Sequence, residues 1–194
     1  MMTEVNHNKQ YQNNEKRILQ GYLSELKLRG ADSAITLSSI AEASDVPYRT
    51  VLGHYINFYE LERSNVEDTA NILCQLADES RLMGDDSRAF LKKLLLTITR
   101  ESLRFQIEYT RRSISVWERA LLYSKDILTQ GWGSYGAETD DIIFHRFCAE
   151  FIGTIFLWGK SGFSITELGI HLTTLLYLVE HATKRELLIQ GYLG

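Results

Sequence analysis

The feature that most constrains this chain is the spacing of its apolar residues, which in most segments recur every three or four positions. One proline, Pro47, occurs in the 194 residues, and few stretches alternate between apolar and polar residues as strands do. Sheet proteins need turn residues about every 8–12 positions, and this sequence lacks them. The sequence therefore predicts an all-α protein.

The composition supports a packed core and gives no sign of export or membrane insertion. Hydrophobic residues make up 44% of the chain and charged residues 24%, values typical of folded globular proteins. The polar N-terminal segment lacks the apolar core of a signal peptide, and no uninterrupted apolar run of about 18 residues suggests a membrane span. Cys74 and Cys148 lie far apart within apolar helical patterns. We expect a cytoplasmic protein, no membrane contact and two buried free thiols.

The pattern of the first 55 or so residues predicts three helices. An apolar stripe over about residues 14–28 indicates a supporting helix. Thr36 is expected to cap a short second helix, and Pro47 suits the first turn of a third. Within the third helix, Val51 and Tyr55 are four residues apart and should face inward, so the polar start of that helix is exposed. This order predicts a helix-turn-helix, in which the first residues of the last helix enter the DNA major groove.

The stretch ITLSSIAEASDVPYRTVLGHYINFYEL resembles the N-terminal signature of TetR-type (TetR/AcrR) bacterial transcriptional regulators. The detailed match covers about residues 14–66 and rests on Thr36, Leu37, Ile40, Ala41, Val46, Pro47, Thr50, Val51, His54 and Tyr55. The sequence departs from the family pattern at Asp45, where the family usually has glycine. It departs again at Leu52, where a tyrosine usually touches phosphate, and at Phe58, where a lysine is usual.

The resemblance implies a DNA-binding domain over residues 1–60 and a C-terminal helical bundle over residues 61–194 that binds a ligand and dimerises. It also implies a homodimer on palindromic double-stranded operator DNA, usually as a repressor, with a ligand that changes the spacing of the two DNA-binding domains. The expected DNA-binding residues are Thr36, Pro47, Tyr48, Arg49, Thr50, His54 and Tyr55. Arg49 could read a guanine edge, Tyr48 could stack on a sugar or a thymine methyl, and His54 could donate to phosphate.

Charge argues against this function. The whole chain carries a net charge of −4, and its first 66 residues hold one more acid than base. A DNA-binding domain is expected to be basic. Three packed helices that serve only as a scaffold therefore remain an alternative reading.

Two strongly apolar helices are expected near the C-terminus, over residues 139–160 and 161–187. Ser164 and Glu167 have the spacing of a capping box at the start of the second. The pair could form the core of one large bundle, or it could join its copy in a dimeric four-helix bundle, as the resemblance implies. The expected dimerisation residues are Ile152, Ile155, Phe156, Leu168, Leu172, Leu175 and Val179.

Aromatic residues are concentrated between these helices and the first domain. Such residues at helical spacing form either core or pocket, although tyrosine and tryptophan bring polar groups that a core does not need. In proteins of the family this region holds the ligand, so the expected ligand-binding residues are Phe105, Tyr109, Trp117, Tyr123, Phe144, Phe147 and Phe151. We expect a small hydrophobic or aromatic effector, bound mainly by burial.

Motifs for catalysis or for cofactors are missing from the sequence. No phosphate-binding glycine loop, CxxC or HExxH occurs. Asp141 with His145, and Glu180 with His181, could each supply half a metal site, although a solvated acid and histidine are commoner. We expect no cofactor, no metal and no enzymatic activity. The predicted function is a ligand-responsive transcriptional regulator, and the alternative is an all-helical small-molecule-binding protein that has lost DNA affinity.

Overall fold

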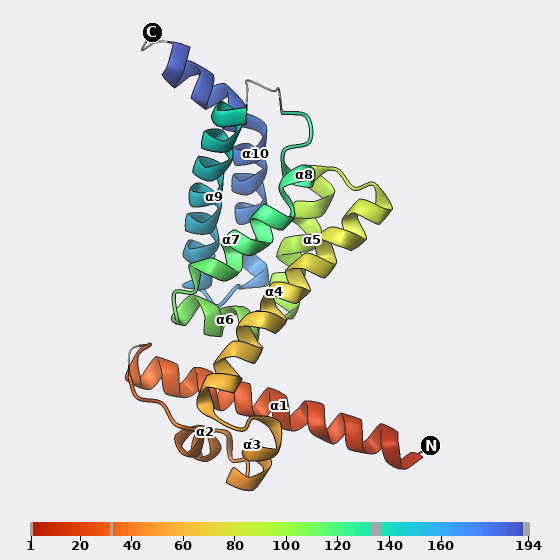
Figure 1. Ribbon diagram of the computed structural model, residues 1–194, viewed down its shortest axis with the longest axis vertical. Coiled ribbons are helices and arrows are strands. Elements are labelled where there is room, and N and C mark those ends of the chain that lie inside the picture. Colours follow the sequence, from red (N-terminus) through yellow and green to blue (C-terminus); the bar gives the residue numbers. More distant parts are fainter. Residues whose placement is uncertain (1, 32, 133–136, 192–194) are drawn as a thin grey trace. The chain divides into compact units, whose positions relative to one another are not determined.

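Every regular element in the described part of the chain is a helix (Figure 1), which confirms the all-α prediction. The computed structural model describes residues 2–31, 33–132 and 137–191, with side chains from 8 to 182 within these ranges. The elements are α1 (Met2–Arg29), α2 (Leu37–Ser44), α3 (Tyr48–His54), α4 (Phe58–Met83), α5 (Ser87–Arg100), α6 (Ser102–Thr110), α7 (Ile114–Tyr123), α8 (Lys125–Leu128), α9 (Ala137–Gly159), the 3-10 turn η1 (Ile165–Glu167) and α10 (Leu168–Gly191).

The chain forms two compact units that interleave along the sequence. The first unit contains the residues up to Asp68 together with Leu103–Ser113, and the second contains Thr69–Ser102 and the residues from Ile114 onward. Helix α4 therefore contributes to both units, and nearly all of α6 belongs to the first. A single cut at residue 60, as the sequence predicts, describes neither feature.

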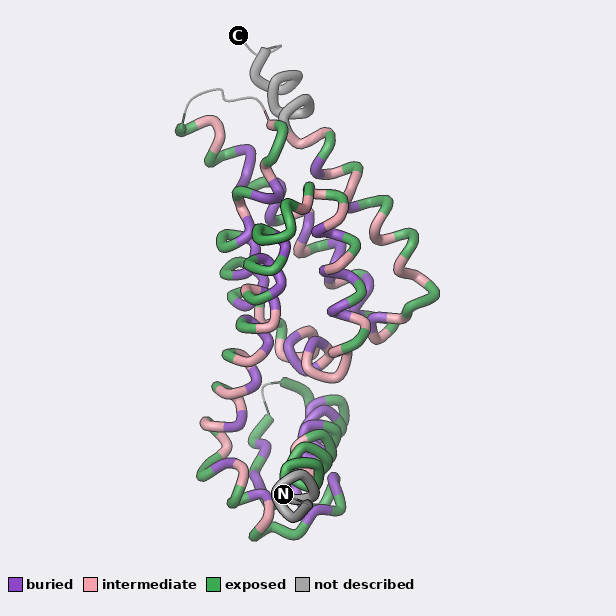
Figure 2. Tube along the Cα trace, turned by 90° about the vertical axis from the view of Figure 1, so that its right-hand side faces the viewer, coloured by how far each residue is buried: buried purple, intermediate pink, exposed green. Residues whose placement is uncertain are grey.

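The core of the first unit is built on the apolar stripe of α1, which packs against α2 and α3. The stripe comprises Ile18, Leu19, Tyr22, Leu23 and Leu26, all buried (Figure 2). Gly21 lies beside this stripe, where a Cβ atom would stand 2.7 Å from the Cβ of Ser44. Glycine at this position therefore allows α1 and α2 to approach closely. The helix ends at Arg29, and Gly30 directly after it has a positive φ of 88°, which suits a residue without a side chain.

Local capping chemistry fixes both ends of α2. The Thr36 hydroxyl accepts a hydrogen bond from the Ser39 backbone N–H at 3.1 Å, and the Ser39 side chain accepts one from the Thr36 N–H. The predicted N-cap is thus confirmed. At the other end Asp45 adopts the left-handed conformation, with φ 50° and ψ 43°, and Val46 N–H donates to the Ala41 carbonyl. This is a Schellman-type end in which an aspartate stands where glycine is favoured.

Helix α6 is held to the first unit by a polar network as well as by the buried side chain of Ile107. Arg104 pairs with Glu15 of α1 at 2.7 Å and with Asp68 of α4 at 3.2 Å. Arg111 pairs with Glu62 of α4 at 3.0 Å. The fully buried Glu108 accepts a hydrogen bond from the Asn65 amide, and burial raises the pKa of its carboxyl group. These contacts explain why α6 belongs to this unit.

In the second unit, α9 and α10 run antiparallel beside each other, and α5 and α7 pack on this pair (Figure 1). The expected capping box at the start of the last helix is not formed. The Ser164 hydroxyl accepts from the Thr166 N–H and begins η1, while the Glu167 carboxylate accepts from the Ser161 hydroxyl at 2.6 Å.

Among the described helices, α9 is long and apolar enough to cross a membrane by length and composition. Half of the residues in its most apolar window are buried within the protein. Core helices of soluble proteins meet the same two criteria.

Candidate functional site

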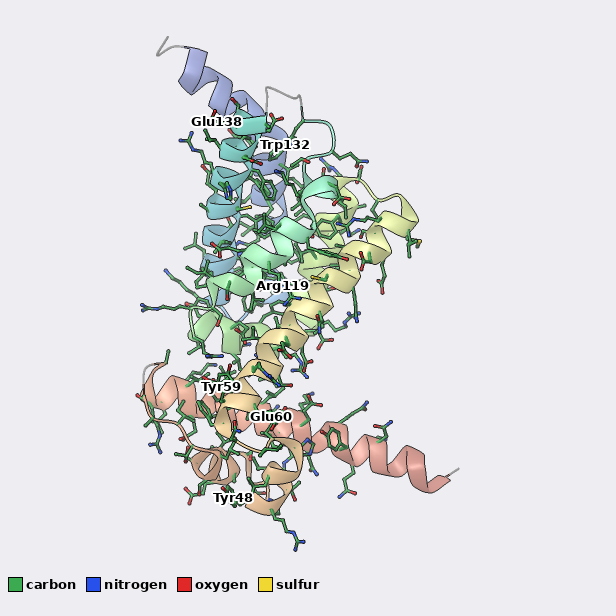
Figure 3. The ribbon with its side chains drawn as sticks, viewed as in Figure 1. Tyr48, Tyr59, Glu60, Arg119, Trp132 and Glu138 are labelled. Atoms are coloured by element: carbon green, nitrogen blue, oxygen red, sulfur yellow. The ribbon has the colours of Figure 1, made fainter. Side chains whose placement is uncertain are left out.

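The outer surface of α2, α3 and the turn between them presents the residues that the sequence marks for DNA contact. We call it the α2–α3 surface. Val51 and Tyr55 are buried and anchor α3 to the core, as expected from their spacing. Around α3, Tyr48 is 50% exposed (Figure 3). Leu52 is 40% exposed, and Arg49 is exposed as well.

The charged groups of this surface differ in how they are engaged. Arg49 makes no ion pair or hydrogen bond with another described residue and faces solvent. The Arg17 guanidinium of α1, in contrast, donates to the backbone carbonyl of Asp45 and lies 3.1 Å from its carboxylate. The Asp45 side chain is itself fully exposed. Arg17 is a cation near α3 that the sequence pattern did not single out, since the residue lies 28 positions before Asp45.

His54 ends α3 and is less available than expected. Its ring stacks on Tyr11 of α1, with centroids 3.9 Å apart and planes inclined by 24°. Its Nδ1 atom is buried without a hydrogen-bond partner. Burial lowers the pKa of this imidazole, a shift that the carboxylate of Glu15 partly opposes. The neutral ring at physiological pH can still donate one hydrogen bond to phosphate, but adds no positive charge.

The remaining residues of the predicted DNA-binding set fall into two groups. Pro47 and Thr36 are exposed and Thr50 is half-buried, so all three lie at the surface. The Thr36 hydroxyl is already used as the α2 cap. Tyr55 lies in the core, and its role is to support α3 rather than to touch a partner.

The structure divides the predicted ligand-binding residues between the two units. Phe105, which is buried, and Tyr109 lie on α6 in the first unit. Phe144, Phe147 and Phe151 form a chain of ring contacts along α9, with centroids 6.2 and 5.7 Å apart. These three rings are packed core.

The other two predicted ligand residues also lie in the second unit. Trp117 is buried in the core. Tyr123 is partly exposed and donates to the Asp78 carboxylate at 2.9 Å, with the Arg81 guanidinium 4.8 Å from its ring centroid. Its hydroxyl is therefore engaged within the unit.

An open groove with a volume of about 360 Å³ lies between α4 and α5 in the second unit. Its lining residues are Ile72, Gln75, Leu76, Glu79, Lys93, Leu96, Thr97, Arg100 and Glu101. None of these belongs to the predicted ligand set. The sequence does hold a pattern that could have indicated this groove, since each helix contributes lining residues at i, i+3, i+4 and i+7. That spacing is also typical of two helices in direct contact, so it does not distinguish a groove from a packed interface.

The predicted dimerisation residues fall into a buried group and a half-buried group. Ile155, Leu175 and Val179 are buried within the unit, whereas Ile152, Phe156, Leu168 and Leu172 are half-buried. Exposed apolar side chains do occur on α9, α10 and the turn η1 between them, namely Ile142, Leu157, Ile165, Ile170 and Tyr177. Gly153 on α9 and Gly169 on α10 are exposed too, and a Cβ at either would meet nothing within 4 Å.

The pairs considered for metal binding are engaged in other contacts. Asp141 pairs with Lys125 at 2.8 Å, and Glu180 pairs with Arg88 at 3.3 Å. Within the described ranges, no group of three or more His, Cys, Asp or Glu side chains is placed to hold a metal ion. Cys74 and Cys148 are both free thiols, as predicted, although Cys74 is only half-buried. Burial raises the pKa of the Cys148 thiol to about 11.

Comparison of the chain with protein-family models, with curated proteins and with solved structures finds no match.

Proposed function

We propose that the protein is a TetR-type transcriptional regulator that binds palindromic operator DNA as a homodimer through a helix-turn-helix formed by α2 and α3. The observation that carries the proposal is the exposed face of α3. Arg49 projects from it without a partner among the residues that the structure describes, while Val51 and Tyr55 fix the helix to the core. A free guanidinium on a rigid helix is suited to bidentate contact with a guanine edge.

Dimerisation through α9 and α10 is the second part of the proposal. The support is the exposed apolar surface on these helices, with Leu157 60% and Ile170 68% exposed. Gly153 inside α9 and Gly169 in the first turn of α10 are exposed glycines, which weaken a lone helix relative to alanine but permit close approach of another helix. A second copy of the chain would cover this surface and present two α3 helices to successive major grooves.

The third part is release from DNA by a small hydrophobic or aromatic ligand. The packed rings of α9 leave little space, so the α4–α5 groove is the site that the geometry favours. Its apolar lining residues Ile72, Leu76 and Leu96 could bury such a molecule, and Glu79 and Arg100 could orient it. A thermal-shift screen in which no hydrophobic compound stabilises the protein would count against this part.

Binding to DNA tests the central part. The protein is titrated with a random duplex pool and with the duplex upstream of its own coding sequence, at 50 and 200 mM salt. Specific binding with a steep salt dependence is expected. Arg49→Ala should relax specificity, costing about 1–3 kcal/mol on the preferred sequence. Arg63→Ala is the matched control, because Arg63 is an exposed arginine of the same unit that pairs with Glu67 on α4.

One observation favours a second function, a helical small-molecule-binding protein without DNA affinity. The first unit carries an acid excess, and the carboxylate of Asp45 is exposed two residues before Pro47. Absence of DNA binding at both salt concentrations, with an intact dimer and a stabilising ligand, would establish this alternative over the regulator.

A further inference from the structure

The exposed face of α3 carries an apolar pair beside its arginine. Tyr48 and Leu52 are four residues apart, so their side chains lie on the same side of the helix. Both are substantially exposed, at 50% and 40%. The sequence pattern marks Leu52 only as the loss of a phosphate-binding tyrosine, yet the structure leaves it at the surface with no apolar neighbour to cover it fully.

The helical geometry determines where each side chain lies around α3. Each residue of a helix turns about 100° from the one before it. With Val51 and Tyr55 directed inward, Arg49 and Gly53 fall on the opposite side, and Tyr48 and Leu52 flank them along one edge. Thr50 and His54 flank them along the other edge. The outermost line of α3 therefore consists of an arginine and a glycine, with an apolar strip on one side and a polar strip on the other.

Gly53 allows this face of α3 to approach a partner closely. A Cβ atom at this position would meet nothing within 4 Å, and no positive φ requires glycine there. An exposed glycine inside a helix lowers stability without any gain in the free protein. Its missing side chain does allow α3 to lie closer to a partner surface, so that the short side chain of Leu52 can reach that surface.

The charges on this face indicate an electronegative partner. Residues 48–54 contain Arg49 and no acid. The nearest acid on the following helix, Glu60, is turned back onto the chain, where its carboxylate accepts from the Ile56 N–H at 2.5 Å (Figure 3). An arginine that pairs with no other described side chain, beside an apolar strip, matches the major-groove edge of DNA, where guanine presents acceptors and thymine presents a methyl group.

We propose that Tyr48 and Leu52 read thymine methyl groups that flank the base pair contacted by Arg49, so that Leu52 is a specificity-determining residue. The inference rests on the proposed function, because it requires that α3 enters the major groove. It predicts that each half-site of the preferred DNA contains a guanine with thymine nearby. Burial of one methyl group is worth about a fourfold change in affinity.

The test removes the methyl groups from the DNA and the apolar side chains from the protein, alone and together. The parent protein first selects its preferred duplex from a random pool. Each thymine of that duplex is then replaced by deoxyuridine, which lacks only the methyl group. For the parent, each half-site should contain one or two thymines whose single replacement weakens binding about fourfold. For Leu52→Ala or Tyr48→Ala, replacement of the thymine that the removed side chain contacts should have no further effect, and the salt dependence of binding should match that of the parent.

Two controls complete the design. Leu82→Ala removes an even more exposed leucine, 88% exposed, from α4 in the second unit, and should respond to deoxyuridine as the parent does. Gly53→Ala should raise the melting temperature yet weaken binding to the selected duplex several-fold, because its methyl group stands between α3 and the groove.

The outcomes separate the two proposals. If no sequence is enriched from the pool, the proposed function fails and this inference falls with it. Another outcome is that a sequence is enriched while deoxyuridine weakens binding by Leu52→Ala and Tyr48→Ala as much as it weakens binding by the parent. That result would support the proposed regulator and overturn the reading of methyl groups by these two residues. Unchanged DNA binding by Gly53→Ala would also overturn it, since the close approach would then not exist.

Discussion

Replacing Asp45 by asparagine should strengthen DNA binding with little effect on the fold. Asp45 occupies the left-handed position that ends α2, with φ 50°, and asparagine tolerates that conformation as well as aspartate does. Its carboxylate is fully exposed and lies 3.1 Å from the Arg17 guanidinium. Exposed ion pairs contribute little to stability. The substitution therefore changes the charge beside α3 while keeping the shape of the turn.

The magnitude follows from two electrostatic effects. At about 7 Å from a phosphate, a carboxylate in water is repelled by roughly RT. Screening at physiological salt leaves less than half of that repulsion, so removal of the charge strengthens binding about 1.5-fold for each nearby phosphate. Loss of the carboxylate also removes the anionic partner of Arg17, whose guanidinium still donates to the backbone carbonyl at position 45 and can make one further phosphate contact. That contact adds about 0.9 to the slope of log affinity against log salt. We expect binding about 2- to 3-fold tighter at 200 mM salt and about 7- to 10-fold tighter at 50 mM.

The assay is fluorescence anisotropy on the selected duplex at both salt concentrations, with thermal unfolding of each variant alongside. Glu67→Gln is the matched control, because it also removes one exposed acid and frees one arginine, Arg63, but on α4. That control should change affinity less than twofold. If Asp45→Asn binds no more tightly than the parent and has the same salt slope, Asp45 does not oppose DNA, and the argument from local charge is wrong.

Three further predictions concern packing, burial and association. Gly21→Ala should lower the free energy of unfolding by about 1–3 kcal/mol in urea titration, because its Cβ would stand 2.7 Å from that of Ser44; unchanged stability would refute the close α1–α2 contact. Burial raises the pKa of Glu108, so the folded protein holds this proton more tightly than the unfolded chain and loses that stabilisation as pH rises above the carboxyl group's ordinary pKa. Glu108→Gln has no such proton, so its melting temperature relative to the parent should rise between pH 4.5 and 8, and a constant difference would contradict the shift. Leu157→Glu should have the mass of one chain in light scattering at concentrations where the parent is a dimer. The control Leu82→Glu, which makes the same change on α4, should remain a dimer. A dimeric Leu157→Glu would exclude α9 from the interface.

The parts of the fold that the sequence predicts are those governed by local rules. The apolar stripe of α1 and the inward positions Val51 and Tyr55 follow from helical periodicity, which depends only on neighbours within two turns. The cap at Thr36 follows from hydrogen bonds that close within three residues. Each of these features is confirmed because no distant contact competes with it.

The placement of α6 could not be predicted in the same way. The contacts of α6 and of the residue directly after it join Arg104 to Glu15 and Arg111 to Glu62, pairs separated by 89 and 49 positions in the sequence. Nothing in the periodicity of α6 distinguishes a helix that packs with its neighbours in sequence from one that returns to the N-terminal unit. The aromatic residues of α9 are ambiguous for a similar reason, since helical spacing is the same for a packed core and for a pocket.

The same long-range contacts change how the acidity of the first unit should be judged. Glu15 and Asp68 are paired with Arg104 of α6, and Glu62 is paired with Arg111, which directly follows α6. Two other acids are also engaged, since Glu25 pairs with Arg29 at 2.8 Å and Glu60 caps the start of α4. These five acids are therefore engaged within the unit, which weakens their repulsion of DNA. Because charge near the α2–α3 surface decides DNA affinity more than the net charge does, Asp45 is the acid whose removal discriminates most sharply between a regulator and a protein without DNA affinity.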